Sequence, residues 1–236
     1  MKWICLMPLL AIGALLYGPA GADDIAGYDL RSSVDADIIT AVDDSSSMTR
    51  LKRMVEYTGL AKAVVDPDFL ARIASGPNGR VGFTAFSWSS DGKIEVIVPW
   101  MLITTADDAA KASAMFLKAI EIDASQQFVV RWTDVALAID AADAISQASP
   151  FARSHTFINI CSDGVSNSGA APRAARDRAL TEDVTINAVL FGNRPMLVDY
   201  YARNVIGGSG AFILPISDAA AMSTLLARKY WLDLTS

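Results

Sequence analysis

The chain has 236 residues, of which 52% are hydrophobic and 19% are charged. This balance is typical of a folded globular protein and excludes a disordered or collagen-like chain. Twenty Lys and Arg side chains against 26 Asp and Glu give a formal net charge of -6, and the sequence contains no basic block. We therefore expect no nucleic-acid partner, because affinity for nucleic acid depends on neutralising phosphates.

Residues 1–22 have the layout of a secretory signal peptide. Lys2 precedes an apolar run from Trp3 to Tyr17, and small residues then lead to an A-x-A type of cleavage site before Asp23. An uncleaved membrane anchor is the alternative, but a proline and a glycine interrupt the run, which is shorter than the about 20 residues a span needs. We expect a periplasmic or secreted protein with no membrane span after cleavage.

The two cysteines argue against a disulfide in the exported chain. Cys5 lies in the predicted signal peptide, so Cys161 is left without a partner. Cys161 ends an apolar run that begins at Thr156 and is typical of a buried strand. We interpret this cysteine as a small core residue and not as a reactive thiol.

Hydrophobic periodicity predicts that strands and helices alternate along the chain. In chain order, the predicted strands cover residues 38–42, 81–88, 94–98, 155–161, 184–191 and 211–216. The predicted helices cover residues 48–65, a short stretch between Asp66 and Gly76, and residues 109–122, 135–148, 172–180, 196–205 and 219–232. Asp91-Gly92 has the sequence of a tight hairpin turn, so the second and third strands are predicted to pair antiparallel.

The strands read as nearly continuous apolar runs, which indicates a mostly parallel sheet buried between helices. We predict a single α/β domain over residues 34–233, with a doubly wound, mostly parallel sheet, one antiparallel edge strand and helices on both faces. Such open sheets bind ligands beyond the carboxyl ends of their strands. The segment 43–47, Thr133 and Asp163 are expected at that edge.

The segment 43–47 reads Asp-Asp-Ser-Ser-Ser and places a carboxylate and two hydroxyls at alternate positions, Asp43, Ser45 and Ser47. Such a loop can direct three oxygens at one hard cation, and Mg²⁺ takes about six oxygen ligands, some of them water. Thr133 precedes a predicted helix and Asp163 follows a predicted strand, so both are placed to complete the set. In the structural alternative, the hydroxyls are helix N-caps and the aspartate belongs to a turn.

With these residues in this order, the chain resembles the von Willebrand factor type A domain and its metal-ion-dependent adhesion site. The resemblance rests on D-x-S-x-S at Asp43, Ser45 and Ser47, on Thr133 and on Asp163 followed by glycine. It implies that the serines and the threonine bind the cation directly or nearly so, while the aspartates act mostly through water. It also implies that one metal position accepts an acidic group of the partner.

Stretches such as 205–212 resemble more narrowly an exported bacterial branch of this superfamily whose function is not established. The chain departs from that branch around Thr133. Arg131 and Trp132 stand where small residues are usual, and Asp134 stands where a small polar residue is common. These departures put metal access or the choice of partner in question, but not the fold.

The resemblance implies a binding module and not an enzyme: Mg²⁺, or alternatively Mn²⁺ or Ca²⁺, would recognise an acidic side chain of a protein partner. A metal-assisted hydrolase or phosphotransferase is one alternative. It is disfavoured because Ser45 stands where a phosphoaspartyl enzyme would have a second carboxylate, and because we expect no lysine near either strand end. The other alternative is a structural envelope protein with a degenerate site, in which Arg131 takes the place of the cation and pairs with Asp43 or Asp163.

Overall fold

The computed structural model describes residues 32–125, 130–180, 183–218 and 221–235. The predicted signal peptide, residues 1–22, lies outside these ranges and stays a prediction. Among the described helices, none is long and apolar enough to cross a membrane.

A six-stranded sheet runs through the middle of the molecule, and five of its strands are parallel. Its edge strand β4 pairs antiparallel with β3, as predicted from the Asp-Gly turn between them. In spatial order the strands are β4 (Ile94–Ile103), β3 (Val81–Trp88), β2 (Asp37–Asp43), β6 (Thr156–Ser162), β7 (Val184–Phe191) and β8 (Ile213–Ile216).

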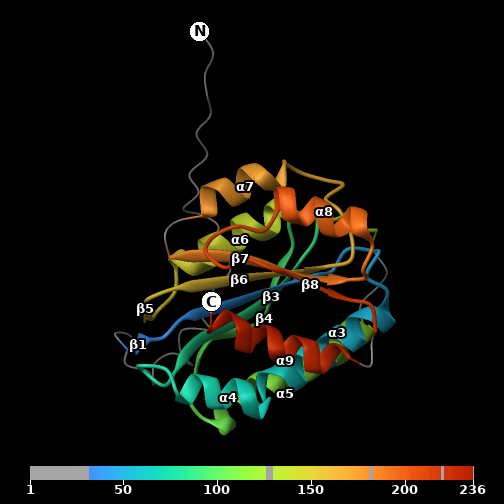
Figure 1. Ribbon diagram of the computed structural model, residues 1–236. Coiled ribbons are helices and arrows are strands. Elements are labelled where there is room, and N and C mark those ends of the chain that lie inside the picture. The colour runs from blue at the N-terminus through green and yellow to red at the C-terminus, as the bar shows by residue number, and fades with distance from the viewer. Residues whose placement is uncertain (1–31, 126–129, 181–182, 219–220, 236) are drawn as a thin grey trace.

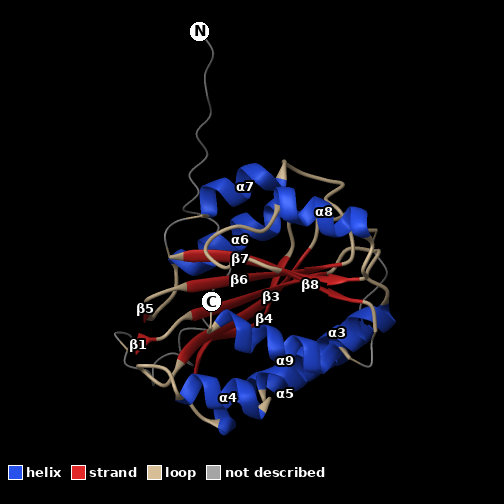
Figure 2. Cartoon of the chain, viewed as in Figure 1, coloured by secondary structure: helices blue, strands red, loops and turns tan. Residues whose placement is uncertain are grey.

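Helices cover both faces of this sheet (Figures 1 and 2). One face is covered by α6 (Val135–Gln147), α7 (Pro172–Ala179) and α8 (Pro195–Asn204). The other face is covered by α3 (Arg50–Val64), α4 (Pro67–Ala74), α5 (Ala106–Ser125) and α9 (Met222–Asp233). The doubly wound α/β fold predicted from the sequence is confirmed.

The central strand β2 carries apolar side chains at successive positions, without the alternation of apolar and polar residues that a half-exposed strand shows. Ile39 and Ala41 pack toward α6, whereas Ile38 and Val42 pack toward α3, and all four are fully buried. A parallel strand between two helix layers has no solvent face, so both of its faces select apolar side chains.

Several elements differ from the prediction at their ends. β4 continues past Pro99 to Ile103, beyond the predicted end at residue 98. Proline is tolerated here because β4 is an edge strand, where a missing N–H need not break the ladder. α5 begins earlier, at Ala106, and β8 begins later, at Ile213. A short parallel pair, β1 (Ser33–Val34) with β5 (Ala152–Arg153), was not predicted.

Cys161 is buried and free, as predicted for a core residue. Near it, a buried polar network joins α9 to the sheet. Lys229 and Asp233 are almost fully buried and form an ion pair of 2.5 Å. The carboxylate of Asp233 also accepts hydrogen bonds from Asn159 of β6 at 3.0 Å and from Asn187 of β7 at 2.9 Å. The network therefore fixes the C-terminal helix against two neighbouring strands.

We expect Lys229→Met to lower the free energy of unfolding by about 3–5 kcal/mol, because it leaves the Asp233 carboxylate buried without its cation. The double variant Lys229→Met/Asp233→Asn should recover more than half of that loss, since no charge is then stranded. Urea denaturation followed by circular dichroism measures both. A single variant that loses less than about 1 kcal/mol would contradict this role of the ion pair.

Candidate metal site

The site begins where β2 and β6 end side by side. These strands pair in parallel register, with Val42 opposite Cys161, so Asp43 and Asp163 emerge at the same edge of the sheet. The Asp43 carboxylate is fully buried and held from two sides. Ser162 Oγ donates to its Oδ2 at 2.5 Å, and the backbone N–H of Ser45 donates to its Oδ1 at 2.7 Å.

The hydroxyls of the D-x-S-x-S loop connect the two strand ends. Ser45 Oγ and Ser47 Oγ form a hydrogen bond of 3.0 Å, and Ser47 Oγ donates to Asp163 Oδ1 at 2.6 Å. Ser45 and Asp163 are buried, whereas Ser47 is exposed. Asp43, Ser45, Ser47 and Asp163 thus form one connected group that opens to solvent at Ser47.

Thr133 reaches the same place from the segment before α6. A methyl group added to Gly164 would lie 3.6 Å from Thr133 Oγ1 and 3.9 Å from Ser47 Oγ, so both hydroxyls border this glycine. The backbone N–H of Thr133 donates to Asn167 Oδ1 at 2.8 Å, which fixes its position. Its hydroxyl makes no hydrogen bond to the described residues. All five residues predicted for the site therefore lie at the same edge of the sheet.

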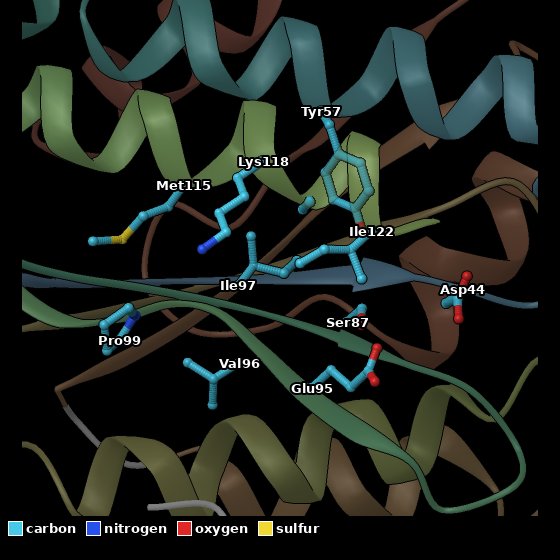
Figure 3. A pocket seen from close by; sticks show the side chains of 11 residues that line it. Asp44, Tyr57, Ser87, Glu95, Val96, Ile97, Pro99, Met115, Lys118 and Ile122 are labelled. Carbon is cyan, nitrogen blue, oxygen red and sulfur yellow. The ribbon is translucent and has the colours of Figure 1, made fainter. Parts of the chain in front are cut away.

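Arg131 does not take the place of a cation at this site. It forms ion pairs with Asp44 at 2.7 Å and with Asp91 at 3.2 Å, and not with Asp43 or Asp163. Asp44 also lies 3.6 Å from Arg53 Nε. Asp44 lies at one end of a pocket that β4 and α5 largely line (Figure 3), and the volume of this pocket is about 480 Å³. The alternative considered from the sequence, in which Arg131 replaces the cation and pairs with Asp43 or Asp163, is therefore wrong.

Sequence reasoning missed Lys52, which lies in the first turn of α3. Its ammonium donates to Asp163 Oδ2 at 2.6 Å and to the carbonyl of Ser47 at 3.3 Å. The expectation that no lysine stands near either strand end is therefore wrong. The sequence did contain a signal: the helix begins shortly after the D-x-S-x-S loop, so a lysine in its first turn lies close to that loop.

Glu56, one turn further along α3, was also missed. It is fully buried, and neither carboxylate oxygen has a hydrogen-bond partner within the described part of the chain. Burial, reinforced by the negative charges of Asp43 and Asp163, raises the pKa of Glu56 well above its ordinary value. Burial also raises the pKa of Asp43 to about 6. The site thus concentrates acidic groups in a buried region, which is unfavourable unless a cation compensates them.

The residues present fit a divalent cation of the hard, oxygen-preferring class. Hydroxyl and carboxylate oxygens converge, one of the hydroxyls has no partner among the described residues, and the surrounding acids favour positive charge. Within the described ranges, no group of three or more His, Cys, Asp and Glu is placed to hold a metal. A cation here would therefore depend on the Ser and Thr hydroxyls for much of its coordination.

One protein family matches most of the chain. The family model described as "Protein of unknown function (DUF1194)" matches residues 33–236. The chain belongs to this family. No curated protein matches it in sequence.

Solved structures resemble the chain in fold. Proximal thread matrix protein 1 from the mussel byssus has a TM-score of 0.54 at 20% identity, with 87% of this chain and 49% of that chain covered. A von Willebrand factor type A protein from Catenulispora acidiphila has a TM-score of 0.56 at 15% identity, with coverage of 84% and 42%. Manganese-loaded TRAP from Plasmodium vivax has a TM-score of 0.51 at 12% identity, with coverage of 81% and 72%.

The chain spans about half the length of the first of these structures. At these identities the likeness establishes the fold, which is that of the von Willebrand factor type A domain. The resemblance stated from the sequence is thus confirmed at the level of the fold, whereas metal binding at the five residues stays a prediction.

We expect Glu56→Gln to become increasingly stabilising as pH rises in metal-free buffer. Above the ordinary pKa of about 4.5, unfolded Glu56 loses its proton while the folded, buried group keeps it, so the wild type loses stability with rising pH. The amide has no proton to lose. The stability difference between variant and wild type should therefore grow by up to about 1.4 kcal/mol per pH unit between pH 5 and the folded-state pKa.

Chemical denaturation at several pH values in the presence of a chelator measures this difference. Glu121→Gln, which removes an exposed glutamate of α5, is the matched control. A constant difference for Glu56→Gln from pH 5 to pH 8 would show that the buried carboxyl is ionised in the folded protein.

Proposed function

We propose that this protein is an exported, metal-dependent protein-binding module. In this proposal, the hydroxyls of Ser45, Ser47 and Thr133 bind a divalent cation, and the carboxylates of Asp43 and Asp163 support it. The observation that carries the proposal is the convergence of these oxygens at the carboxyl edge of the sheet, where Thr133 offers a hydroxyl unpaired within the described part of the chain.

The ligand set explains why such a site would favour an acidic partner. Three neutral hydroxyls leave much of the cation's charge uncompensated, so the bound metal would supply an electrophilic centre that attracts a carboxylate. Hydrogen bonds from neighbouring residues hold the groups around that centre in position. Ser162 and the Ser45 N–H orient Asp43, and Tyr201 Oη donates to the Gly164 carbonyl at 3.0 Å. These contacts hold the two strand ends in place.

Exposed apolar side chains near the site support a protein as partner. Trp132 is 58% exposed beside Thr133, and Met196 at the start of α8 is 86% exposed. Leu51 in the first turn of α3 is 65% exposed, and Val165 after Asp163 is 43% exposed. Large apolar groups at a polar edge are typical of protein-binding surfaces, in which tryptophan often contributes most of the affinity.

Two similar structures support a metal. One structure of the mussel byssus protein has a zinc-occupied MIDAS motif, and the Plasmodium vivax TRAP structure is loaded with manganese. For this chain, Mg²⁺ is our first candidate, with Mn²⁺ and Ca²⁺ as the others, because the oxygen donors suit all three.

A phosphoryl-transfer enzyme remains the weaker alternative. Lys52 removes the objection that a lysine is lacking. The other objection stands, because Ser45 occupies the position where a phosphoaspartyl enzyme would have its second carboxylate. The proposal therefore assigns no catalytic residue.

We expect Mg²⁺ or Mn²⁺ to stabilise the wild type and not Thr133→Val. For a Kd of about 1 mM, 10 mM metal adds about 1.4 kcal/mol, or about 3–6 °C in melting temperature. Valine keeps the shape of threonine and removes only the hydroxyl, so the metal-free melting temperature should be nearly unchanged. Differential scanning fluorimetry measures both. Equal metal shifts in both proteins would exclude Thr133 as a ligand, and no shift in the wild type would refute the metal site.

The partner should be captured only in the presence of the cation. Immobilised wild type is exposed to an envelope or extracellular fraction with Mg²⁺, or with a chelator in excess. Thr133→Val, which keeps the exposed surface, serves as the metal-deficient protein, and Trp132→Ser tests the apolar surface. Capture should be lost with chelator and with Thr133→Val, and weakened by Trp132→Ser. Undiminished capture by Thr133→Val would contradict metal-dependent binding.

A further inference from the structure

The ammonium of Lys52 lies against Asp163, one of the five residues of the proposed metal site. It contacts Asp163 Oδ2 at 2.6 Å and the Ser47 carbonyl at 3.3 Å. The Asp163 side chain is 4% exposed, whereas that of Lys52 is 47% exposed. The positive charge therefore comes from a side chain that can move into solvent, while the carboxylate is fixed in the fold.

The position of Lys52 on its helix is unfavourable without this contact. The N-terminus of a helix carries partial positive charge, so acidic residues are usual in the first turn and cations are disfavoured there. The first turn of α3 contains no acidic residue, and Arg50, Lys52 and Arg53 all lie in it or next to it. The acidic groups of the site must offset this repulsion, and Asp163 does so for Lys52.

A divalent cation and the Lys52 ammonium compete for one group. Asp163 is one of the two carboxylates proposed to support the metal, and its Oδ1 already accepts from Ser47 while its Oδ2 accepts from Lys52. Positive charges drawn to the same carboxylate repel each other. The ammonium must therefore leave Asp163, at least in part, when a metal approaches.

We propose that Lys52 is the internal counter-ion of the metal site and sets its affinity. This inference rests on the proposed function. In the metal-free protein, Lys52 compensates the charge of Asp163. Metal binding exchanges this monovalent, tethered cation for a divalent one, and the cost of displacing Lys52 weakens metal binding, so that the site fills only where the metal is abundant.

Isothermal titration calorimetry with MgCl₂ and MnCl₂ tests the exchange on the wild type, Lys52→Met and Lys62→Met. Methionine forms helices about as well as lysine, and removing a cation from the first turn relieves the unfavourable dipole interaction, so Lys52→Met is expected to fold. Lys62, exposed in the last turn of the same helix, is the matched control because its replacement changes the net charge equally. We expect Lys52→Met to bind both metals roughly three- to tenfold more tightly than the wild type.

A second readout follows the ammonium directly. NMR detection of lysine side-chain ¹⁵N–¹H groups should show, besides the ammonium of buried Lys229, a further protected ammonium in the metal-free wild type that is absent from Lys52→Met. This signal should disappear or shift as MgCl₂ is added. Its persistence at saturating metal would overturn the exchange, because Lys52 would then stay on Asp163.

The outcomes separate this inference from the function on which it rests. If the wild type binds metal and Lys52→Met binds it equally or more weakly, the counter-ion role is wrong while the metal site stands. A comparable gain in Lys62→Met would also overturn it, because general charge would explain the effect. If neither the wild type nor Lys52→Met binds metal, the proposed function itself fails. Tighter binding by Lys52→Met alone supports both.

Discussion

The parallel, in-register pairing of β2 with β6 is the constraint on which the rest of the site depends. It brings Asp43 and Asp163 to one edge of the sheet, and the 2.5 Å hydrogen bond from Ser162 to Asp43 ties the two strand ends together. The hydroxyls of Ser47 and Thr133 meet at Gly164 on this edge, where the hydrogen bond to Asn167 holds Thr133.

The same pairing gathers acidic side chains in a buried region, where their negative charges need compensation. Asp43 and Glu56 are fully buried, and Asp163 is nearly so. Burial raises the pKa values of Asp43 and Glu56, and buried acidic groups need compensating cations in order to stay ionised. The chain supplies one cation from a flexible side chain, Lys52, and keeps Arg131 occupied with Asp44 and Asp91. A bound divalent ion would complete the compensation that these contacts begin.

Much of this arrangement could be predicted from the sequence, because it depends on local signals. Apolar runs in strands such as β2 indicate burial on both faces, and D-x-S-x-S followed by Thr133 and Asp163 indicates one edge of the sheet. The extension of β4 beyond Pro99 was missed although an antiparallel edge strand was predicted, because an apolar run alone does not show that an edge strand can continue through a proline. Lys52 and Glu56 were missed because periodicity assigns residues to helix faces but does not reveal which groups face them across the fold. Arg131 was misassigned for the same reason, since its partners Asp44 and Asp91 come from two different loops.

The central claim is that this edge of the sheet binds a divalent cation through hydroxyl oxygens. Anomalous diffraction from crystals grown with MnCl₂ tests it most directly, because the manganese signal locates the ion independently of the protein coordinates. We expect a single strong anomalous peak within bonding distance of the hydroxyls of Ser45, Ser47 and Thr133, with the Lys52 ammonium displaced from Asp163. Ordered density for these residues without an anomalous peak, and with Lys52 still bonded to Asp163, would contradict it.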